Sequence, residues 1–255
     1  MDESAGELVH LAAHGGVATV TLDSPANRNA LSAQLVGELD AHLRASFADP
    51  DVRVVHLTAT GPVFCAGADL KAGGGPITTD FPAILAAVMS SPKPVVAEIN
   101  GHVRAGGVGL VAACDIAVAP VSATFAFTEV RLGLLPAMIA VPVSRKMARR
   151  PMERYFLTGE TFSGVEAASS GLVTVAVADG EVASVTGAIL DGLRLGGPQA
   201  LAGIKPMLAE ISARGIDDAF AWARRISAQR FASDEAAEGM ASFRERRPPR
   251  WAGGG

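Results

Sequence analysis

Aromatic side chains are scarce in this chain. Phenylalanine, tryptophan and tyrosine together make up 5% of its 255 residues. Proteins that hold single-stranded nucleic acid stack its bases on aromatic rings, so this scarcity argues against such a surface. An excess of basic residues is also absent, because 22 Lys and Arg stand against 26 Asp and Glu, for a net charge of −4. Attraction to a phosphate backbone is then weak, and we expect no nucleic-acid partner.

Cysteine is nearly missing as well. Cys65 and Cys114 are the only two, they show no metal-ligand spacing, and both have apolar neighbours in the sequence. We therefore expect two buried, reduced thiols, with neither a disulfide nor a metal site.

Long apolar runs are the third absence. No uninterrupted apolar stretch of the sequence approaches the length of a membrane span, which is about 20 residues. The opening stretch MDESAGELVH is acidic and lacks the apolar segment of a secretion signal. These features predict a cytoplasmic protein without a membrane partner.

Small apolar residues are abundant instead, and 49% of the chain is hydrophobic. The length suits one large domain with room for a smaller appendage. The patterning predicts a hairpin over 8–22, a helix capped by Ser32 and ending at Phe47, a strand over 52–60, a helix around 80–90, and strands over 114–119 and 123–130. Such alternation of strands and helices is typical of an α/β or coiled ββα architecture.

The last quarter of the chain changes character. After GGPQA at 196–200, amphipathic helical patterns follow one another without a strand signal. Ser233 precedes DEAAEGM as an N-cap, and a basic stretch, RERRPPRW, comes near the end. Before this quarter, Ser163 and Glu166 predict a capping box. We expect 196–255 to be a helical segment that folds over the core or contacts another subunit.

Three glycines lie close together in HVRAGGVGLVAACD, residues 102–115. One interpretation is the dinucleotide turn of an NAD(P)-dependent oxidoreductase, because Gly107, Gly109 and Ala112 match G-x-G-x-x-A and Glu129 follows about twenty residues later. Against it, the stretch NGHVRA separates the preceding strand from the glycines, whereas that turn is normally tight. A second interpretation is close helix packing. The third is an oxyanion hole, for which the Gly-containing turn VFCAGADLK supplies a second backbone N–H.

Five stretches stand in a characteristic order along the chain: NRNALS (27–32), FCAGADLK (64–71), SPKPVVAEINGHVRAGGVGLVAACDIAVA (91–119), ATFAFTEVRLGLLPA (123–137) and RYFLTGETFSGVEAASSGLV (154–173). Together they resemble the enoyl-CoA hydratase/isomerase (crotonase) superfamily over nearly the whole chain. The resemblance implies an α/β fold with a crotonase-like ββα spiral core at 1–195 and a helical C-terminal oligomerisation segment at 196–255. It also implies a homotrimer, often paired into a hexamer.

The resemblance further implies an acyl-CoA site. In the family two backbone N–H groups bind the thioester oxygen, and the motifs place them at Ala68 and Gly106. Two fixed donors stabilise the negative charge that builds up on this oxygen when a proton is moved beside the thioester. Many hydratases of the family carry two glutamates, of which the second is present as Glu129, whereas Gly109 stands at the position of the first. We expect apolar surroundings to raise the pKa of Glu129, although an ion pair with Arg131 is the plainer alternative.

Residues for the CoA moiety follow from the same motifs. The resemblance implies that CoA, itself part of the substrate, is the only cofactor-like group and that no metal is needed. The expected CoA and substrate contacts are Arg28, Ala66, Ala68, Asp69, Leu70 and Lys71. Arg28 and Lys71 are equally interpretable as ordinary surface charges. Phe243 and the basic tail either cover a neighbour's nucleotide or simply pack.

Four functions stay open at this point. The overall resemblance favours syn addition of water to a 2-enoyl-CoA, while a single glutamate suits a Δ3-Δ2 enoyl-CoA isomerase. Gly109 also permits a non-catalytic acyl-CoA-binding relative, and the glycine pattern permits an NAD(P)-binding oxidoreductase. Arg104 replaces the apolar residue usual in the family, and it faces solvent, pairs with an acid, or contacts a substrate carboxylate.

Overall fold

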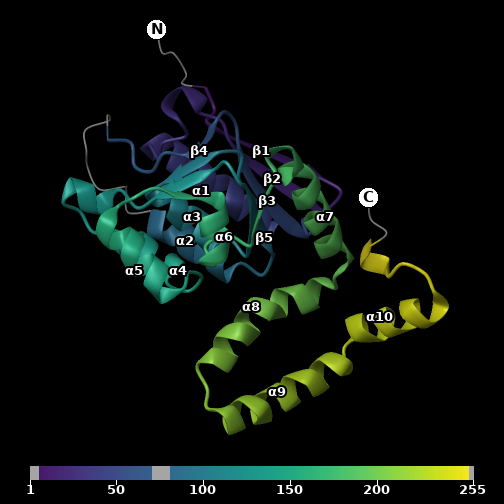
Figure 1. The fold of residues 1–255 in the computed structure, drawn as a ribbon. Coiled ribbons are helices and arrows are strands. Elements are labelled where there is room, and N and C mark those ends of the chain that lie inside the picture. The colour runs from purple at the N-terminus through teal and green to yellow at the C-terminus, as the bar shows by residue number, and fades with distance from the viewer. Residues whose placement is uncertain (1–5, 71–80, 253–255) are drawn as a thin grey trace.

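The larger sheet in this protein has the strand order β1-β2-β3-β5-β7-β10 (Figure 1). The computed structural model describes residues 6–70 and 81–252. These strands are β1 (Val9–His14), β2 (Val17–Leu22), β3 (Val54–Ala59), β5 (Val95–Glu98), β7 (Ile116–Pro120) and β10 (Val175–Val177). The β1-β2 pair is antiparallel, so the predicted hairpin is confirmed. All the other pairs in this sheet are parallel.

A second, smaller sheet has the order β4-β6-β8-β9. Its strands are β4 (Val63–Cys65), β6 (His102–Arg104), β8 (Thr124–Ala126) and β9 (Phe162–Ser163). The chain places β3, β5 and β7 in the large sheet and the strand after each of them in the small one, with a helix following. This repeated strand–strand–helix turn is a ββα spiral, so the predicted fold class is confirmed.

Helix α1 (Ala33–Ala48) shows how local sequence sets these elements. The Ser32 hydroxyl accepts a hydrogen bond from Leu35 N at 3.2 Å, which satisfies one of the free N–H groups of the first turn. Leu35, Leu39 and Leu43 are buried on one face, and burying each contributes about 1.5–3 kcal/mol. The expected helix is therefore confirmed, with its end one residue past Phe47.

Two helices bring the later turns of the spiral back to the large sheet. Helix α2 (Phe81–Ser90) matches the expected helix around 80–90. Helix α3 (Gly106–Ala113) begins within the glycine cluster, and all of its residues are buried. It therefore lies in the centre of the molecule, between other elements.

Two strand expectations were wrong in detail. The strand expected over 123–130 ends at Ala126, and Glu129–Leu132 instead form the 3-10 helix η2, which Gly133 terminates with a φ of +72°. The stretch NGHVRA, expected to be a connection, contains β6. The strands of the small sheet are so short that they give no alternating pattern in the sequence.

Four further helices lie between β8 and the C-terminal segment. They are α4 (Ala137–Val143), α5 (Arg149–Thr158), α6 (Gly164–Ser169) and α7 (Val182–Leu195), with 3-10 turns at Pro25–Asn27 (η1), Asp179–Glu181 (η3) and Arg250–Ala252 (η4). The capping box at the start of α6 is confirmed, because Glu166 N donates to Ser163 Oγ at 3.3 Å and Ser163 N donates to Glu166 Oε2 at 2.8 Å.

The C-terminal helices α8 (Pro198–Ser212), α9 (Ile216–Phe231) and α10 (Asp234–Glu245) extend away from the core and return towards the end of α7 (Figure 1). Ser233 caps α10, as expected. Lys205 of α8 forms an ion pair with Asp115 at 2.8 Å. Arg53 donates to Gly196 O at 2.6 Å and to Trp251 O at 2.8 Å. One side chain thus holds both the beginning and the end of this helical segment.

The core explains the two cysteines. Cys65 and Cys114 are buried and free, so the expectation of two buried thiols that form no disulfide is confirmed. Burial away from water raises the pKa of both thiols to about 12, so neither is a reactive thiolate near neutral pH. Within residues 6–70 and 81–252, no helix is both long and apolar enough to cross a membrane.

Candidate active site

Three parallel strand ends meet at one edge of the small sheet. β4 pairs in parallel with β6, and β6 pairs in parallel with β8. The turn carrying Ala68, the start of α3 at Gly106, and Glu129 each come directly after one of these strands. Ligands of open α/β sheets typically bind beyond the carboxyl ends of the strands. The fold therefore brings the three predicted residues to a common edge.

The turn after β4 is held from the segment before α1. Ala66 N donates to Arg28 O at 3.0 Å, and Leu31 N donates to Gly67 O at 2.8 Å. Leu31 and Ala68 also form an isolated parallel bridge. Gly67 has a φ of +85°, which glycine adopts without strain. The peptide group of Ala68 is thus fixed on one side by hydrogen bonds.

The start of α3 packs directly against this turn. A Cβ on Gly67 would lie 2.8 Å from Ala105 Cβ and 3.4 Å from Gly106 N. Ala105 itself has a φ of +46°, uncommon for a residue with a side chain, and its N–H donates to Ala126 O at 3.0 Å. The two turns that carry Ala68 and Gly106 are therefore neighbours, while their role as oxyanion donors stays a prediction.

Glu129 opens the 3-10 turn after β8 and is partly buried. Its Oε2 is buried and has no hydrogen-bond partner among the described residues. Desolvation raises the pKa of this carboxyl above its ordinary value, against a smaller opposing effect of its own backbone N–H. The expected direction is confirmed. Among the described residues no ion pair joins Glu129 to Arg131, whose guanidinium donates to Thr158 O at 3.3 Å.

Gly109 lies opposite a side chain that sequence reasoning missed. A Cβ on Gly109 would lie 2.7 Å from Ile139 Cβ of α4, closer than two packed carbon atoms approach. Ile139 is 3% exposed. The place where a second carboxylate would begin is therefore filled by an apolar side chain. In the sequence, Ile139 is one of several apolar residues in a helix and carries no distinguishing signal.

The surroundings of Gly107 and Gly109 argue against the dinucleotide interpretation. A Cβ on Gly107 would lie 2.7 Å from Cys65 Cβ, so the Gly107 position is covered by the protein itself, as Gly109 is by Ile139. A phosphate loop needs open backbone N–H groups facing a ligand. Close packing accounts for these two glycines, while Gly106 lies at the turn.

The expected CoA contacts are distributed around the same turn. Ala66 and Ala68 are partly buried, and Asp69 accepts a hydrogen bond from Asn27 Nδ2 at 2.9 Å. Arg28 has an exposed side chain, and Leu70 is 55% exposed. Lys71 lies outside the described residues. The turn after β4 thus carries Asp69 and Leu70 and lies beside Arg28. Contact of these three residues with CoA stays a prediction.

Arg104 is half-buried and bound to the small sheet. Its guanidinium donates to Val103 O at 2.9 Å, to Thr124 O at 2.6 Å and to Thr124 Oγ1 at 2.8 Å. No carboxylate in the described ranges forms an ion pair with it. Desolvation lowers its pKa. The expectation of an acid partner is thus not met by those residues, and a substrate carboxylate stays a hypothesis.

Exposed apolar side chains follow β8 along the chain. Leu132 on η2, Leu134 in the connection to α4, and Met138 in the first turn of α4 are 55%, 54% and 38% exposed, and Leu135 is 83% exposed. Contiguous exposed apolar surface commonly marks a binding site or an interface. An acyl chain or a neighbouring subunit would both find apolar contacts here.

Known proteins match this chain over most of its length. The sequence profile described as Enoyl-CoA hydratase/isomerase matches residues 12–254. Enoyl-CoA hydratase EchA19 of Mycobacterium tuberculosis is 31% identical over 246 residues, which cover 92% of each chain. The crystal structure of an enoyl-CoA hydratase from Mycobacterium avium is 43% identical with a TM-score of 0.73, covering 97% of this chain and 100% of that one. AtuE of Pseudomonas aeruginosa is 33% identical with a TM-score of 0.89, covering 96% of this chain and 100% of that one.

The sequence match, the ββα spiral and the common edge that carries Ala68, Gly106 and Glu129 agree with one another. The chain belongs to the enoyl-CoA hydratase/isomerase family.

Proposed function

We propose that this protein hydrates a 2-enoyl-CoA thioester and that Glu129 is the single carboxylate that transfers protons in the reaction. The observation that carries the proposal is the buried, unpartnered Oε2 of Glu129 at the strand edge where the Ala68 and Gly106 turns meet. An acid/base group with a raised pKa suits proton transfer at neutral pH. Several relatives are named enoyl-CoA hydratases, which supports the same choice.

The reaction follows from these groups. Glu129 takes a proton from water while the water oxygen bonds to Cβ of the enoyl group and the π electrons move to the thioester oxygen. The backbone N–H groups of Ala68 and Gly106 stabilise the resulting enolate, and losing one such donor typically costs about 10²–10³-fold in rate. Glu129 then returns its proton to Cα on the same face. Water has been added and the carboxylate is regenerated.

A second candidate, Δ3-Δ2 isomerisation, is favoured by the contact between Gly109 and Ile139. That contact leaves an apolar side chain where a second carboxylate would help to hold water. In the isomerase reaction Glu129 takes a proton from C2 of a 3-enoyl-CoA and returns it to C4, and the double bond moves without water. The same two backbone donors hold the dienolate.

A panel of 2-enoyl- and 3-enoyl-CoA substrates separates the candidates. Absorbance of the conjugated thioester falls when 2-enoyl substrates are hydrated and rises when 3-enoyl substrates are isomerised. If no 2-enoyl substrate is hydrated and 3-enoyl substrates are turned over, the second candidate replaces the first. Tight acyl-CoA binding with neither reaction would identify a non-catalytic relative.

We also propose that the enzyme needs no cofactor apart from CoA and that it acts in the cytoplasm. A third proposal is that the helical segment 196–255 mediates assembly into a trimer or hexamer. Support for assembly comes from Ile216, Phe220, Phe231 and Phe243, which are 78%, 74%, 70% and 84% exposed. Light scattering after size-exclusion chromatography measures the subunit number, and cell fractionation tests the location, since some relatives are named as mitochondrial.

A further inference from the structure

We propose that Asn29 is a positioning residue that aims the backbone N–H of Ala68 at the substrate oxygen. The inference rests on the proposed function, because it assigns a task to a group that does not itself reach the substrate. Asn29 is fully buried, with 0% of its surface exposed. It belongs to the NRNALS stretch, and its polar side chain is enclosed where the chain passes from η1 to α1.

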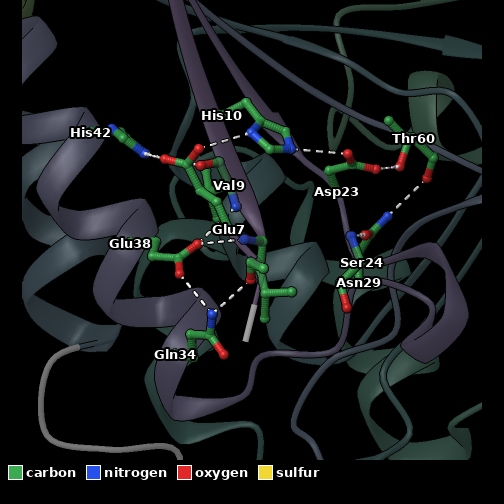
Figure 2. A network of polar contacts seen from close by, with 12 residues as sticks. Glu7, Val9, His10, Asp23, Ser24, Asn29, Gln34, Glu38, His42 and Thr60 are labelled. Atoms are coloured by element: carbon green, nitrogen blue, oxygen red, sulfur yellow. Dashed lines mark hydrogen bonds and ion pairs between the residues drawn. The ribbon is translucent and has the colours of Figure 1, made fainter. Parts of the chain in front are cut away.

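Every polar group of the Asn29 side chain is used. Its Oδ1 accepts from Ser24 N at 2.7 Å, and its Nδ2 donates to Thr60 O at 3.0 Å and to Val63 O at 2.8 Å. Figure 2 shows the amide between Ser24 and Thr60. Thr60 and Val63 bound the short connection from β3 to β4. One buried amide thus joins the segment before α1 to the strand that leads into the Ala68 turn.

The backbone around Asn29 is equally specific. Arg28 and Asn29 have φ values of +55° and +52°, in the left-handed region that asparagine tolerates better than most residues. Asn29 N donates to Ser24 O at 2.9 Å. This turn directs Arg28 O towards Ala66 N, and it directs Leu31 N towards Gly67 O. Residues on both sides of Asn29 therefore hold the two residues that precede Ala68.

The bond to Gly67 O determines where Ala68 N–H points. The Gly67 carbonyl and the Ala68 N–H belong to one planar peptide group, which is trans because the chain has no cis peptide bond in the described ranges. In a trans peptide these two groups point in opposite directions. When Leu31 N fixes the carbonyl at 2.8 Å, it also fixes the N–H to face away from Leu31. Hydrogen bonding to the carbonyl further polarises the N–H as a donor.

Asn29→Gly tests this chain of contacts, because glycine keeps the left-handed backbone and removes all three side-chain bonds. Asn29→Ser, which retains a hydroxyl, is the second variant in case the first folds poorly. Thr60→Val is the matched control. It removes the bond from Thr60 Oγ1 to Asp23 but leaves the carbonyl that Asn29 binds.

Two readouts separate aiming from general stability. The first is kcat and KM on the best enoyl-CoA substrate. The second is the infrared carbonyl stretch of bound butanoyl-CoA, a saturated thioester that is neither hydrated nor isomerised. We expect Asn29→Gly to lower kcat about 10–100-fold, within the loss caused by removing one oxyanion donor, with KM changed less than threefold. We also expect the bound carbonyl stretch to move towards its value in water, and Thr60→Val to change neither.

The failures are distinguishable. If bound butanoyl-CoA shows no lowered carbonyl stretch in the unmutated enzyme, the oxyanion assignment itself is wrong. If the unmutated enzyme lowers the stretch and the folded Asn29 variants lower it equally, only the positioning role is overturned. A fall in melting temperature with unchanged kcat for folded enzyme also overturns it, because a purely structural residue behaves in that way.

Discussion

Ile139 occupies the space into which any side chain at Gly109 would grow, with its Cβ 2.7 Å from where a Gly109 Cβ would stand. This contact ties the identity of one helix residue in α3 to that of another in α4. A change at either position must therefore be judged together with the other.

Gly109→Glu alone should destabilise the protein. Overpacking costs about 1–3 kcal/mol, which corresponds to a fall in melting temperature of roughly 2–12 °C for a chain of this size. Gly109→Glu combined with Ile139→Gly should destabilise less than the sum of the two single changes, because the clash is gone, and it should raise the rate on 2-enoyl-CoA above that of Ile139→Gly. Calorimetry and the absorbance assay measure both. Gly37→Glu, at an exposed position with nothing within 4 Å of a Cβ, is the control.

Glu129→Gln should lower kcat about 10²–10⁴-fold, the range for losing a general acid/base. Binding of butanoyl-CoA, measured by calorimetry, should change little because the side chain keeps its size. Glu153→Gln removes an exposed ion pair with Arg149 and should leave both unchanged. An active Glu129→Gln enzyme would refute the assignment.

The pKa of Glu129 gives a pH dependence with a definite sign. Because burial raises this pKa in the folded protein, the folded state binds the proton more tightly than the unfolded chain does. The resulting contribution to stability is present at low pH and is lost as pH rises from the unfolded pKa through the raised folded one. Glu129→Gln should thus gain melting temperature relative to the parent at pH 8 more than at pH 4. Equal gains at both would contradict the raised pKa.

The pKa of His10, a base rather than an acid, is also raised in the folded protein, so its contribution to stability is likewise lost as pH rises. Its Nδ1 contacts Glu7 at 3.1 Å and its Nε2 contacts Asp23 at 3.0 Å (Figure 2). Only the protonated ring donates to both, and the hydrogen bonds to Glu7 and then Asp23 raise its pKa above 6.5. This stability is fully present below pH 6.5 and is lost as pH rises through the raised pKa. His10→Gln should flatten that part of the stability curve. His14→Gln, on the same strand, is the control.

Local signals in the sequence predicted local structure well. The Ser32 cap, the capping box of Ser163 and the hairpin all depend on neighbouring residues, and each is confirmed. The strand His102–Arg104 was missed, and the one after Ala123 was drawn too long, because strands of three residues are set by their partners in the sheet rather than by periodicity.

The candidate site divides in the same way. The motifs named Ala68, Gly106 and Glu129, whose catalytic roles stay predictions, and apolar surroundings correctly predicted the direction of the Glu129 pKa. Ile139 and Asn29 were not identified, since their roles depend on contacts with residues 30 or more positions away. A single sequence does not display such contacts.

The guanidinium of Arg53 binds Gly196 O and Trp251 O, and Trp251 Nε1 donates to Leu195 O at 3.0 Å. The segment that carries the three C-terminal helices therefore begins and ends at one point on the core. A chain fixed at both ends has fewer arrangements than a free tail. The apolar faces of α8, α9 and α10 are consequently held in a limited set of positions relative to the core. The distance between these helices and the core is then set by the length and sequence of the segment itself.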